Sequence, residues 1–372
     1  QMTLSNPFPA SFPLTQATGK TLGANTGLGD SVSFVNPDRP LQHSDRVNVG
    51  VQTALPGGIV ADITYFINFT NQSCNGDFTG NCYTTKNVDM MDPRLYYKYG
   101  DALNQSVANP FFGLNIPGPL ANQRQVSIAS LMVPYPQYTG ISEIEGIDGA
   151  LSHYQSLQIK LQKRFSRGYS FLAGYNYHRE QDQVYYDSVA QYLNHFTWAD
   201  GGTARHRLTV SGTWELPFGR GRAYLSGTNR LVDAVAGGWN ATGLATYQSG
   251  APVKFSGLNA TGNPGSNVSS GAYLNPSVLT NQDPHVEPTS PWFFSGVNGP
   301  HFFNLDASLV KDFHLTERIK FSLRMDAFNA LNNANYASPN MNPGDPSTFG
   351  RSTNLLNNTF GRQLQLGLRM SF

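Results

Sequence analysis

Long segments in which apolar and polar residues alternate constrain this chain more than any other feature. Between residues 361 and 372, every even position from Leu364 to Phe372 is apolar, whereas Gln363, Gln365 and Arg369 occupy odd positions. Successive side chains of a β-strand point to opposite faces. The segment therefore predicts a strand with one apolar and one polar face.

The same alternation recurs along the rest of the chain. It is clear in 59–69, 207–216, 303–309 and 319–327, and weaker in 45–55, 149–165, 169–180 and 237–249. Together these segments predict about nine strands of about ten to thirteen residues; a strand that crosses a bilayer needs about 9–11. Strands of soluble proteins most often have about 5–6 residues. The lengths favour a transmembrane antiparallel up-and-down β-barrel and leave a soluble β-sandwich as the alternative.

The connections between these segments alternate in length. Short turns are expected at 56–58, 166–168 and 314–317, long loops at 70–148, 181–204, 250–300 and 331–360, and a link of intermediate length at 217–236. Outer-membrane barrels have short periplasmic turns and longer extracellular loops. Counted back from a periplasmic Phe372, every short turn falls on the periplasmic side.

Aromatic residues lie near the ends of the expected strands, as in the aromatic girdles of membrane barrels. These residues are Tyr65, Phe69, Tyr175, Tyr177, Trp214, Trp239, Tyr247 and Phe372.

Composition and charge exclude several classes of protein. The chain has 25 Lys and Arg against 24 Asp and Glu, a net charge of +1, so it lacks the basic surplus of a nucleic-acid-binding protein. No apolar run approaches the length of a membrane-spanning helix. The chain begins at Gln1 without a signal-peptide pattern. We therefore expect it to be the C-terminal part of a longer protein.

Several motifs, in this order and spacing, resemble the barrel of TonB-dependent outer-membrane receptors, particularly the Oar-like group with an N-terminal carboxypeptidase-regulatory-like domain. The motifs are VGVQTALPGG (49–58), NPFFG (109–113), PYPQYTG (134–140), YQSLQIKLQKRFSRGYSFLAGYNY (154–177), HRLTVSGTWELPFGRGR (206–222), NLDASLVKDF (304–313), FSLRMDAFNALNNANY (321–336) and the terminal LQLGLRMSF.

The resemblance implies a barrel of about 22 strands, filled by a plug and energised by TonB. On this interpretation 1–44 is an extracellular loop region and 45–372 is the C-terminal portion of the barrel. The plug and the remaining strands lie outside this sequence, so we expect an open, curved sheet with edges at 45–55 and 361–372. The implied partners are outer-membrane lipid, the TonB complex through the missing plug, and a bulky ligand such as a glycan or a siderophore. The resemblance also implies that Phe372 is read by the barrel assembly machinery.

The two cysteines lie in one expected extracellular loop. Cys74 and Cys82 are separated by NGDFTGN, whose Asn, Asp and Gly residues favour turns. Exported cysteines in such an arrangement oxidise, which predicts a disulfide between them.

No motif indicates catalysis. The histidines lack metal-ligand spacing, and neither GxSxG nor GxxxxGK[ST] occurs. We expect no enzyme activity, no cofactor and no metal. Besides the receptor, two hypotheses stay open: a passive outer-membrane barrel or surface adhesin without TonB coupling, and a soluble all-β carbohydrate-binding protein.

Overall fold

The computed structural model describes residues 21–38, 42–71, 75–76, 82–83, 85–144, 150–314 and 319–372, and only the backbone of residues 24, 75, 76, 82, 83 and 314. The described residues form two compact units. Unit 1 lies within Gln1–Arg39 and Tyr83–Ile147, and unit 2 within Pro40–Cys82 and Asp148–Phe372.

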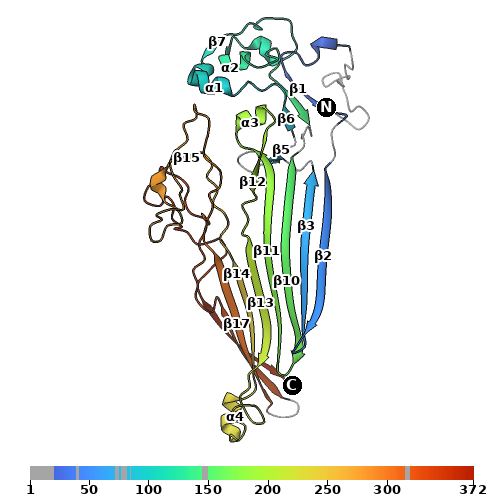
Figure 1. The fold of residues 1–372 in the computed structure, drawn as a ribbon, viewed down its shortest axis with the longest axis vertical. Helices are drawn as coiled ribbons and strands as arrows, with labels where there is room; N and C mark the ends of the chain where they lie inside the picture. The colour runs from blue at the N-terminus through green and yellow to red at the C-terminus, as the bar shows by residue number, and fades with distance from the viewer. Residues whose placement is uncertain are drawn as a thin grey trace, which may run out of the picture. The chain divides into compact units, whose positions relative to one another are not determined.

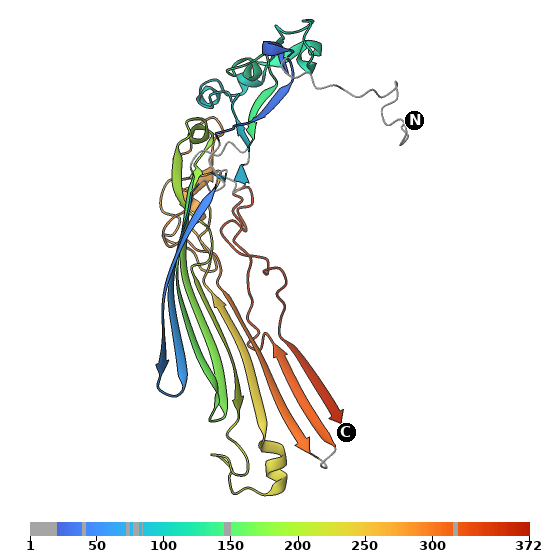
Figure 2. The same cartoon turned by 90° about the vertical axis from the view of Figure 1, so that its right-hand side faces the viewer.

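Unit 2 is built on one antiparallel sheet in which neighbouring strands follow each other along the chain (Figure 1). The path consists of nine strands: β2 (His43–Leu55), β3 (Ile59–Asn71), β10 (Leu151–Ser166), β11 (Tyr169–Tyr185), β13 (His206–Glu215), β14 (Trp239–Gln248), β17 (Phe302–His314), β18 (Lys320–Phe328) and β19 (Gln363–Ser371). Figure 2 shows that the sheet is curved. Within the described residues no pairing joins β2 to β19, so the sheet is open at the two edges that the sequence predicted.

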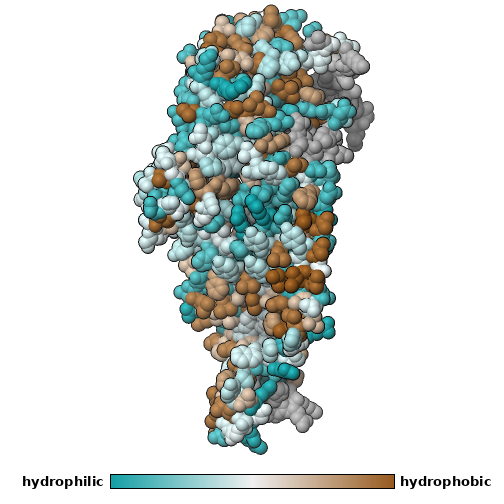
Figure 3. Space-filling model, viewed as in Figure 1, coloured by the Kyte–Doolittle hydropathy of each residue, from teal (hydrophilic) through white to brown (hydrophobic). Residues whose placement is uncertain are grey.

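The register gives the sheet one apolar and one polar face. Leu366 lies opposite Met325, which lies opposite Leu309. On the other side Gln365 lies opposite Asp326. We call these the apolar face and the polar face. Figure 3 shows apolar side chains gathered over the strands on one side of the molecule.

β11 is longer than the sequence indicated, because it continues to Tyr185 whereas the predicted segment was 169–180. β10 has 16 residues and β11 has 17, whereas β18 and β19 have nine each. The prediction that 181–204 is a loop is wrong in part. The last residues of β11 pair with β12 (Phe196–Asp200), with α3 (Ser188–Tyr192) between them. Backbone pairing continues the ladder there although the apolar alternation has ended.

The sheet has a turn end and a loop end. The turn end carries the connection at 56–58 and the two-residue turn Arg167–Gly168, whose φ values of 54° and 83° suit the tight turn of a twisted hairpin. The turn predicted at 314–317 lies outside the described residues, apart from the backbone of residue 314. The connection from β13 to β14, also at this end, contains α4 (Arg230–Ala236). The long connections lie at the loop end and contain β4 (Asn75–Gly76), β5 (Cys82–Tyr83), β15 (Leu258–Ala260), η4 (Pro276–Val278) and β16 (Leu279–Asn281).

Unit 1 consists of short elements. They are η1 (Gly23–Asn25), β1 (Ser31–Val35), β6 (Thr85–Asn87), α1 (Arg94–Tyr99), η2 (Gly100–Asn104), β7 (Ser106–Ala108), η3 (Pro119–Asn122), β8 (Gln125–Ser127), α2 (Ile128–Leu131) and β9 (Gly140–Ile144). β9 pairs with β1 in parallel and with β6 in antiparallel orientation.

A small interior stabilises unit 1. Leu103 and Leu120 are buried, and the buried Asn109 donates from Nδ2 to the carbonyls of Leu120 (2.8 Å) and Gln123 (2.7 Å). Gly118 is packed against the backbone of residue 29 so closely that a Cβ would lie 1.9 Å from its carbonyl carbon. The segment before β2 and the first long connection therefore fold together as one unit.

Candidate functional site

The polar face of the sheet contains a hollow of about 550 Å³. Its charged lining comes from Asp62 on β3, Lys160 on β10 and Arg207 on β13. Lys160 lies opposite Asp62 in the register, and Thr64 donates from its hydroxyl to the Asp62 carboxylate (3.1 Å). The hollow thus presents charges of both signs within four neighbouring strands.

A glycine leaves this hollow open. Gly174 on β11 stands between Lys160 and Thr209 in the register, and a Cβ added there would meet no atom within 4 Å. The neighbouring Asn176 has a buried Oδ1 that lacks a hydrogen-bond partner in the described structure. The site can therefore accept a polar group that supplies a donor.

The polar face continues with paired charges on the last strands. Arg324 and Asp326 form an ion pair on β18 (2.8 Å), and Lys320 pairs with Asp312 across β17 and β18 (2.8 Å). Such a surface suits water or a polar partner and not lipid.

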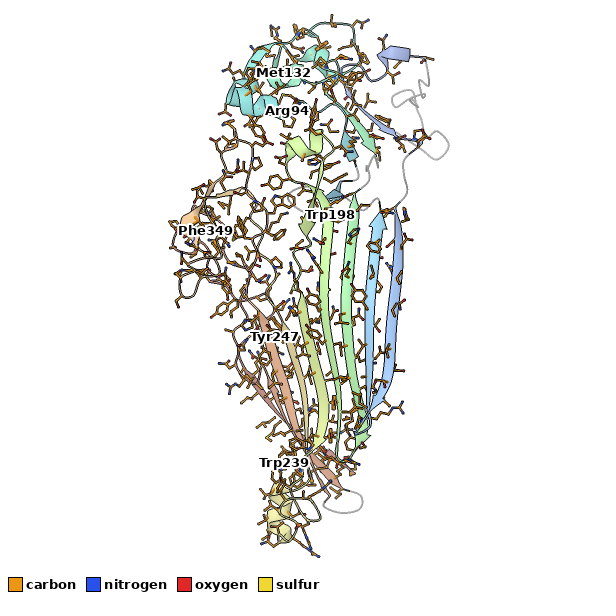
Figure 4. The ribbon with its side chains drawn as sticks, in the orientation of Figure 1. Arg94, Met132, Trp198, Trp239, Tyr247 and Phe349 are labelled. Atoms are coloured by element: carbon orange, nitrogen blue, oxygen red, sulfur yellow. The ribbon has the colours of Figure 1, made fainter. Side chains whose placement is uncertain are left out.

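A buried apolar cluster of unit 2 lies in its loops and not in its sheet. Phe255 and Leu274 are almost fully buried in it, and Phe349 enters it from a different connection. The other buried members are Val253, Leu258, Leu279 and Val297. Figure 4 shows Phe349 among the loop residues. The connections between β14 and β17 and between β18 and β19 therefore form one folded loop module, which we define as residues 249–301 and 329–362.

A third connection is joined to the loop module. Tyr186, directly after β11, stacks on Trp292 with ring centroids 5.6 Å apart, and its hydroxyl donates to the carbonyl of Ser290. Burial raises the pKa of the Tyr186 phenol. The ammonium group of Lys254 lies over the ring of the same Trp292, 4.4 Å from its centroid. The loops thus present a pre-formed surface.

Buried asparagines order the loop module, and one of them also binds it to the sheet; no role was predicted for them from the sequence. Asn329 is 4% exposed and donates from Nδ2 to the carbonyls of Asn333 and Phe360, both at 2.9 Å. Asn335 is 3% exposed and binds the backbone of Phe303. The unusual run of asparagines after β18 was the available signal.

The predicted aromatic positions in the strands lie on the apolar face, but the expectation that all of them lie near strand ends is wrong. Tyr65 is in the middle of β3, and Tyr175 and Tyr177 are in the middle of β11, which extends beyond the predicted segment. Trp239 begins β14 next to α4, and Tyr247 lies near the opposite end of the same strand (Figure 4). Trp214 is half exposed, in register with Ala241. Trp239 and Tyr247 thus place an aromatic residue near each end of β14.

The assembly role of Phe372 and the disulfide both stay predictions. Phe372 follows β19 and is 93% exposed. Cys74 lies outside the described residues, as does the side chain of Cys82, so their disulfide stays a prediction. The backbone strand that begins at Cys82 pairs with the strand that begins at Asn75.

Among the described residues, no group of three His, Cys, Asp or Glu side chains is arranged to hold a metal ion. None of the helices in the described ranges has the length and hydropathy to span a membrane.

Comparison with solved structures finds similar chains, and two outer-membrane proteins are among them. The chain is similar to the outer membrane transporter YddB from Escherichia coli at 9% identity and a TM-score of 0.41, covering 92% of this chain and 34% of that one. It is also similar to the ferripyoverdine receptor of Pseudomonas aeruginosa at 11% identity and a TM-score of 0.39, covering 89% of this chain and 27% of that one. The chain thus spans about a third or less of either structure. Comparison with curated proteins gives no match.

Comparison with protein families gives a match over nearly the whole chain. The outer membrane beta barrel domain covers residues 1–365. That match agrees with the long antiparallel strands, the apolar face and the alternation of short and long connections. The chain belongs to the outer membrane beta barrel domain family.

Proposed function

We propose that this chain is the C-terminal part of the barrel of a TonB-dependent receptor that imports a bulky nutrient, such as a glycan or a siderophore, across the outer membrane. Residues 1–44 are then an extracellular loop region and 45–372 the barrel portion. The plug that contacts TonB comes from another part of the protein. The proposal involves no catalysis and no cofactor.

The observation that carries the proposal is the number of strands in the open sheet. Nine strands lie on the path and every neighbouring pair is antiparallel, so the edge strands β2 and β19 run in the same direction. Antiparallel closure therefore requires an odd number of further strands. The nine strands alone do not meet this condition, and two copies inserted in the same orientation would place β2 of one copy parallel to β19 of the other. A barrel of about 22 strands, the size of plugged transporters, leaves about thirteen to be added, which is odd.

The polar hollow and the loop module support a binding role. Asp62, Lys160 and Arg207 give the inner surface charged groups for contacts with a plug or with a polar ligand. The loop module adds a folded surface at the loop end. A passive barrel or surface adhesin is the second candidate, because a pre-formed loop surface would serve adhesion equally well. Outer-membrane family membership removes the soluble carbohydrate-binding alternative.

Two measurements on the complete gene product separate the receptor from the passive barrel. The first is capture of the purified protein by the periplasmic domain of TonB. The second is KCl conductance after insertion into planar bilayers. A plugged receptor binds TonB and gives no steady KCl conductance. A passive pore does not bind TonB and gives a steady KCl conductance. Absence of TonB binding together with steady conductance would overturn the proposal.

A further inference from the structure

The connection between β13 and β14 is a folded segment at the turn end of the sheet. Its helix α4 is capped at the start by Asn229, whose Oδ1 accepts from the backbone N–H of Val232 (2.9 Å). The carboxylate of Asp233 accepts from the N–H of Arg220 (2.7 Å) and so closes the segment on itself. The other described turns at this end are far shorter and contain no helix. This one has a structure of its own.

Two side chains of the apolar face hold the helix. Trp239 donates from its indole N–H to the carbonyl of Val235 (2.9 Å). The ammonium group of Lys311, 3% exposed, donates to the carbonyls of Gly237 and Asp233. Trp239 and Lys311 lie opposite each other in the register on the apolar face. The helix is therefore attached on the side of the sheet that faces lipid in an outer-membrane barrel.

The helix exposes apolar side chains at this position. Leu231 is 80% exposed and Val235 is 73% exposed, and four-residue spacing puts them on one side of the helix. Tyr224 and Leu225, in the segment leading to the helix, are 60% and 48% exposed. Leu231 and Val235 are thus left largely uncovered by the described residues.

The charges of the segment are mostly positive. Between residues 217 and 238 there are three basic residues and one acidic residue: Arg220, Arg222 and Arg230, and Asp233. Arg222 also pairs with Glu215 at the end of β13 (3.0 Å). A short helix with an apolar side and nearby basic residues has the composition of an interfacial membrane helix, which buries its apolar side at the headgroup–acyl boundary.

We propose that α4 and the segment before it lie in the periplasmic leaflet of the outer membrane and bind phospholipid. Leu231 and Val235 enter the acyl boundary, and the arginines contact lipid phosphates. Trp239 and Lys311 fix the helix at this depth. The proposal depends on the family's location in the outer membrane and not on TonB coupling, so the two proposals can fail separately.

Site-directed spin labelling of the complete gene product tests the location of the helix. Nitroxides are attached to Leu231→Cys and Val235→Cys, with Cys74 and Cys82 replaced by Ser. A label at Pro56→Cys, in the exposed turn between β2 and β3, is the control. The protein is reconstituted in vesicles of phosphatidylethanolamine and phosphatidylglycerol, and collisions with oxygen and with a water-soluble nickel chelate are compared. Leu231 is so exposed that labelling removes little packing, and Tyr224→Cys provides a second position.

The expected result is a collision rate that favours oxygen over the nickel chelate at 231 and 235 and the reverse at 56. Equal access of the nickel chelate to all three positions would overturn the proposal. Labels that are water-accessible in pure vesicles but protected in native outer membranes would also overturn it, because they would assign the apolar side to a periplasmic protein.

Discussion

The side-chain amide of Asn335 pairs with both backbone groups of Phe303. Its Oδ1 accepts from the Phe303 N–H (2.8 Å) and its Nδ2 donates to the Phe303 carbonyl (3.0 Å). A neighbouring strand would make the same two bonds. One buried side chain therefore continues the ladder beyond the point where β18 has ended.

Replacement of Asn335 by Ala should loosen the loop module. The change leaves the N–H of Phe303 without its partner, at about 1–3 kcal/mol for a buried group that stays unpaired, whereas the carbonyl keeps the bond from Asn333 Nδ2 (3.2 Å). We expect faster proteolysis of residues 329–362 while the strands stay protected. Asn357→Ala, at an exposed asparagine of the same connection, is the control. Equal proteolysis rates for the two variants would show that the Asn335 bonds contribute nothing to the loop.

Arginine substitutions on β19 should distinguish its two faces. Leu366→Arg places a charge on the apolar face and should cost about 2–4 kcal/mol near the middle of the membrane. Gln365→Arg places the same charge on the polar face, opposite Asp326, and should be mild. The measurement is urea unfolding of the complete protein in lipid vesicles. Similar midpoints for both variants would contradict the assignment of the faces.

Two glycines of the sheet should respond differently to a side chain. Gly174→Ala fills open space in the polar hollow, so the free energy of unfolding should change by less than about 0.5 kcal/mol. Gly212→Ala brings a Cβ to 2.7 Å from the carbonyl oxygen of Ser170 and should destabilise by about 1–3 kcal/mol. Both are measured by the same unfolding assay. A larger loss at 174 than at 212 would mean that the hollow is already filled.

The buried Asp89 should give unit 1 a pH dependence. Burial raises the pKa of its carboxyl, although the N–H of Tyr135 donates to it (2.8 Å). Between the ordinary pKa of about 3.9 and the raised one, the folded state binds more protons than the unfolded state. Stability is therefore lost as the pH rises through this range. Asp89→Asn should abolish the loss, measured by hydrogen exchange of unit 1 amides.

Asp92 provides a control, because its effect on stability changes with pH in the opposite direction. Hydrogen bonds from Arg94 lower the pKa of Asp92. The contribution of Asp92 to the stability of the folded state is therefore present above the ordinary pKa and is lost as the pH falls. Asp92→Asn should thus change the stability of unit 1 at the acidic end of the titration. The interpretation of Asp89 fails if its Asn variant keeps the pH slope of the parent.

Deletion of Phe372 should reduce assembly more than stability. The side chain is 93% exposed, and burial of one rim phenylalanine contributes at most a few kcal/mol. We expect less of the full-length protein in the outer membrane, measured as the heat-modifiable band in membrane fractions. Phe360→Ala, in the loop module, is the control. Normal membrane levels after the deletion would rule out an assembly signal.

The strands were predictable because residues close together in the sequence determine each of them. The alternation of Leu364, Leu366 and Leu368 fixes both the strand and its faces, and the register with Met325 confirms them. The pairing of β11 with β12 was missed because Gln181 and Gln183 carry no apolar alternation, although their backbones pair.

The packing of the loops could not be predicted from local sequence patterns. Phe349 packs against Phe255 and Leu274 across a wide separation in sequence, and nothing near Phe349 indicates its partners. Asp89 and Tyr135 are likewise brought together only by the fold of unit 1. The polar hollow required the register of four strands, which places Lys160 between Asp62 and Gly174.

The insertion of Phe349 into a core formed by another connection also limits how the outer surface of this protein can change. A connection that packs only on itself can be exchanged between related barrels as a separate cassette. Here the connection from β14 to β17 and that from β18 to β19 complete each other, so a graft of one alone would leave a cavity in the recipient. Specificity grafts, and natural recombination that preserves folding, have to transfer the two connections together.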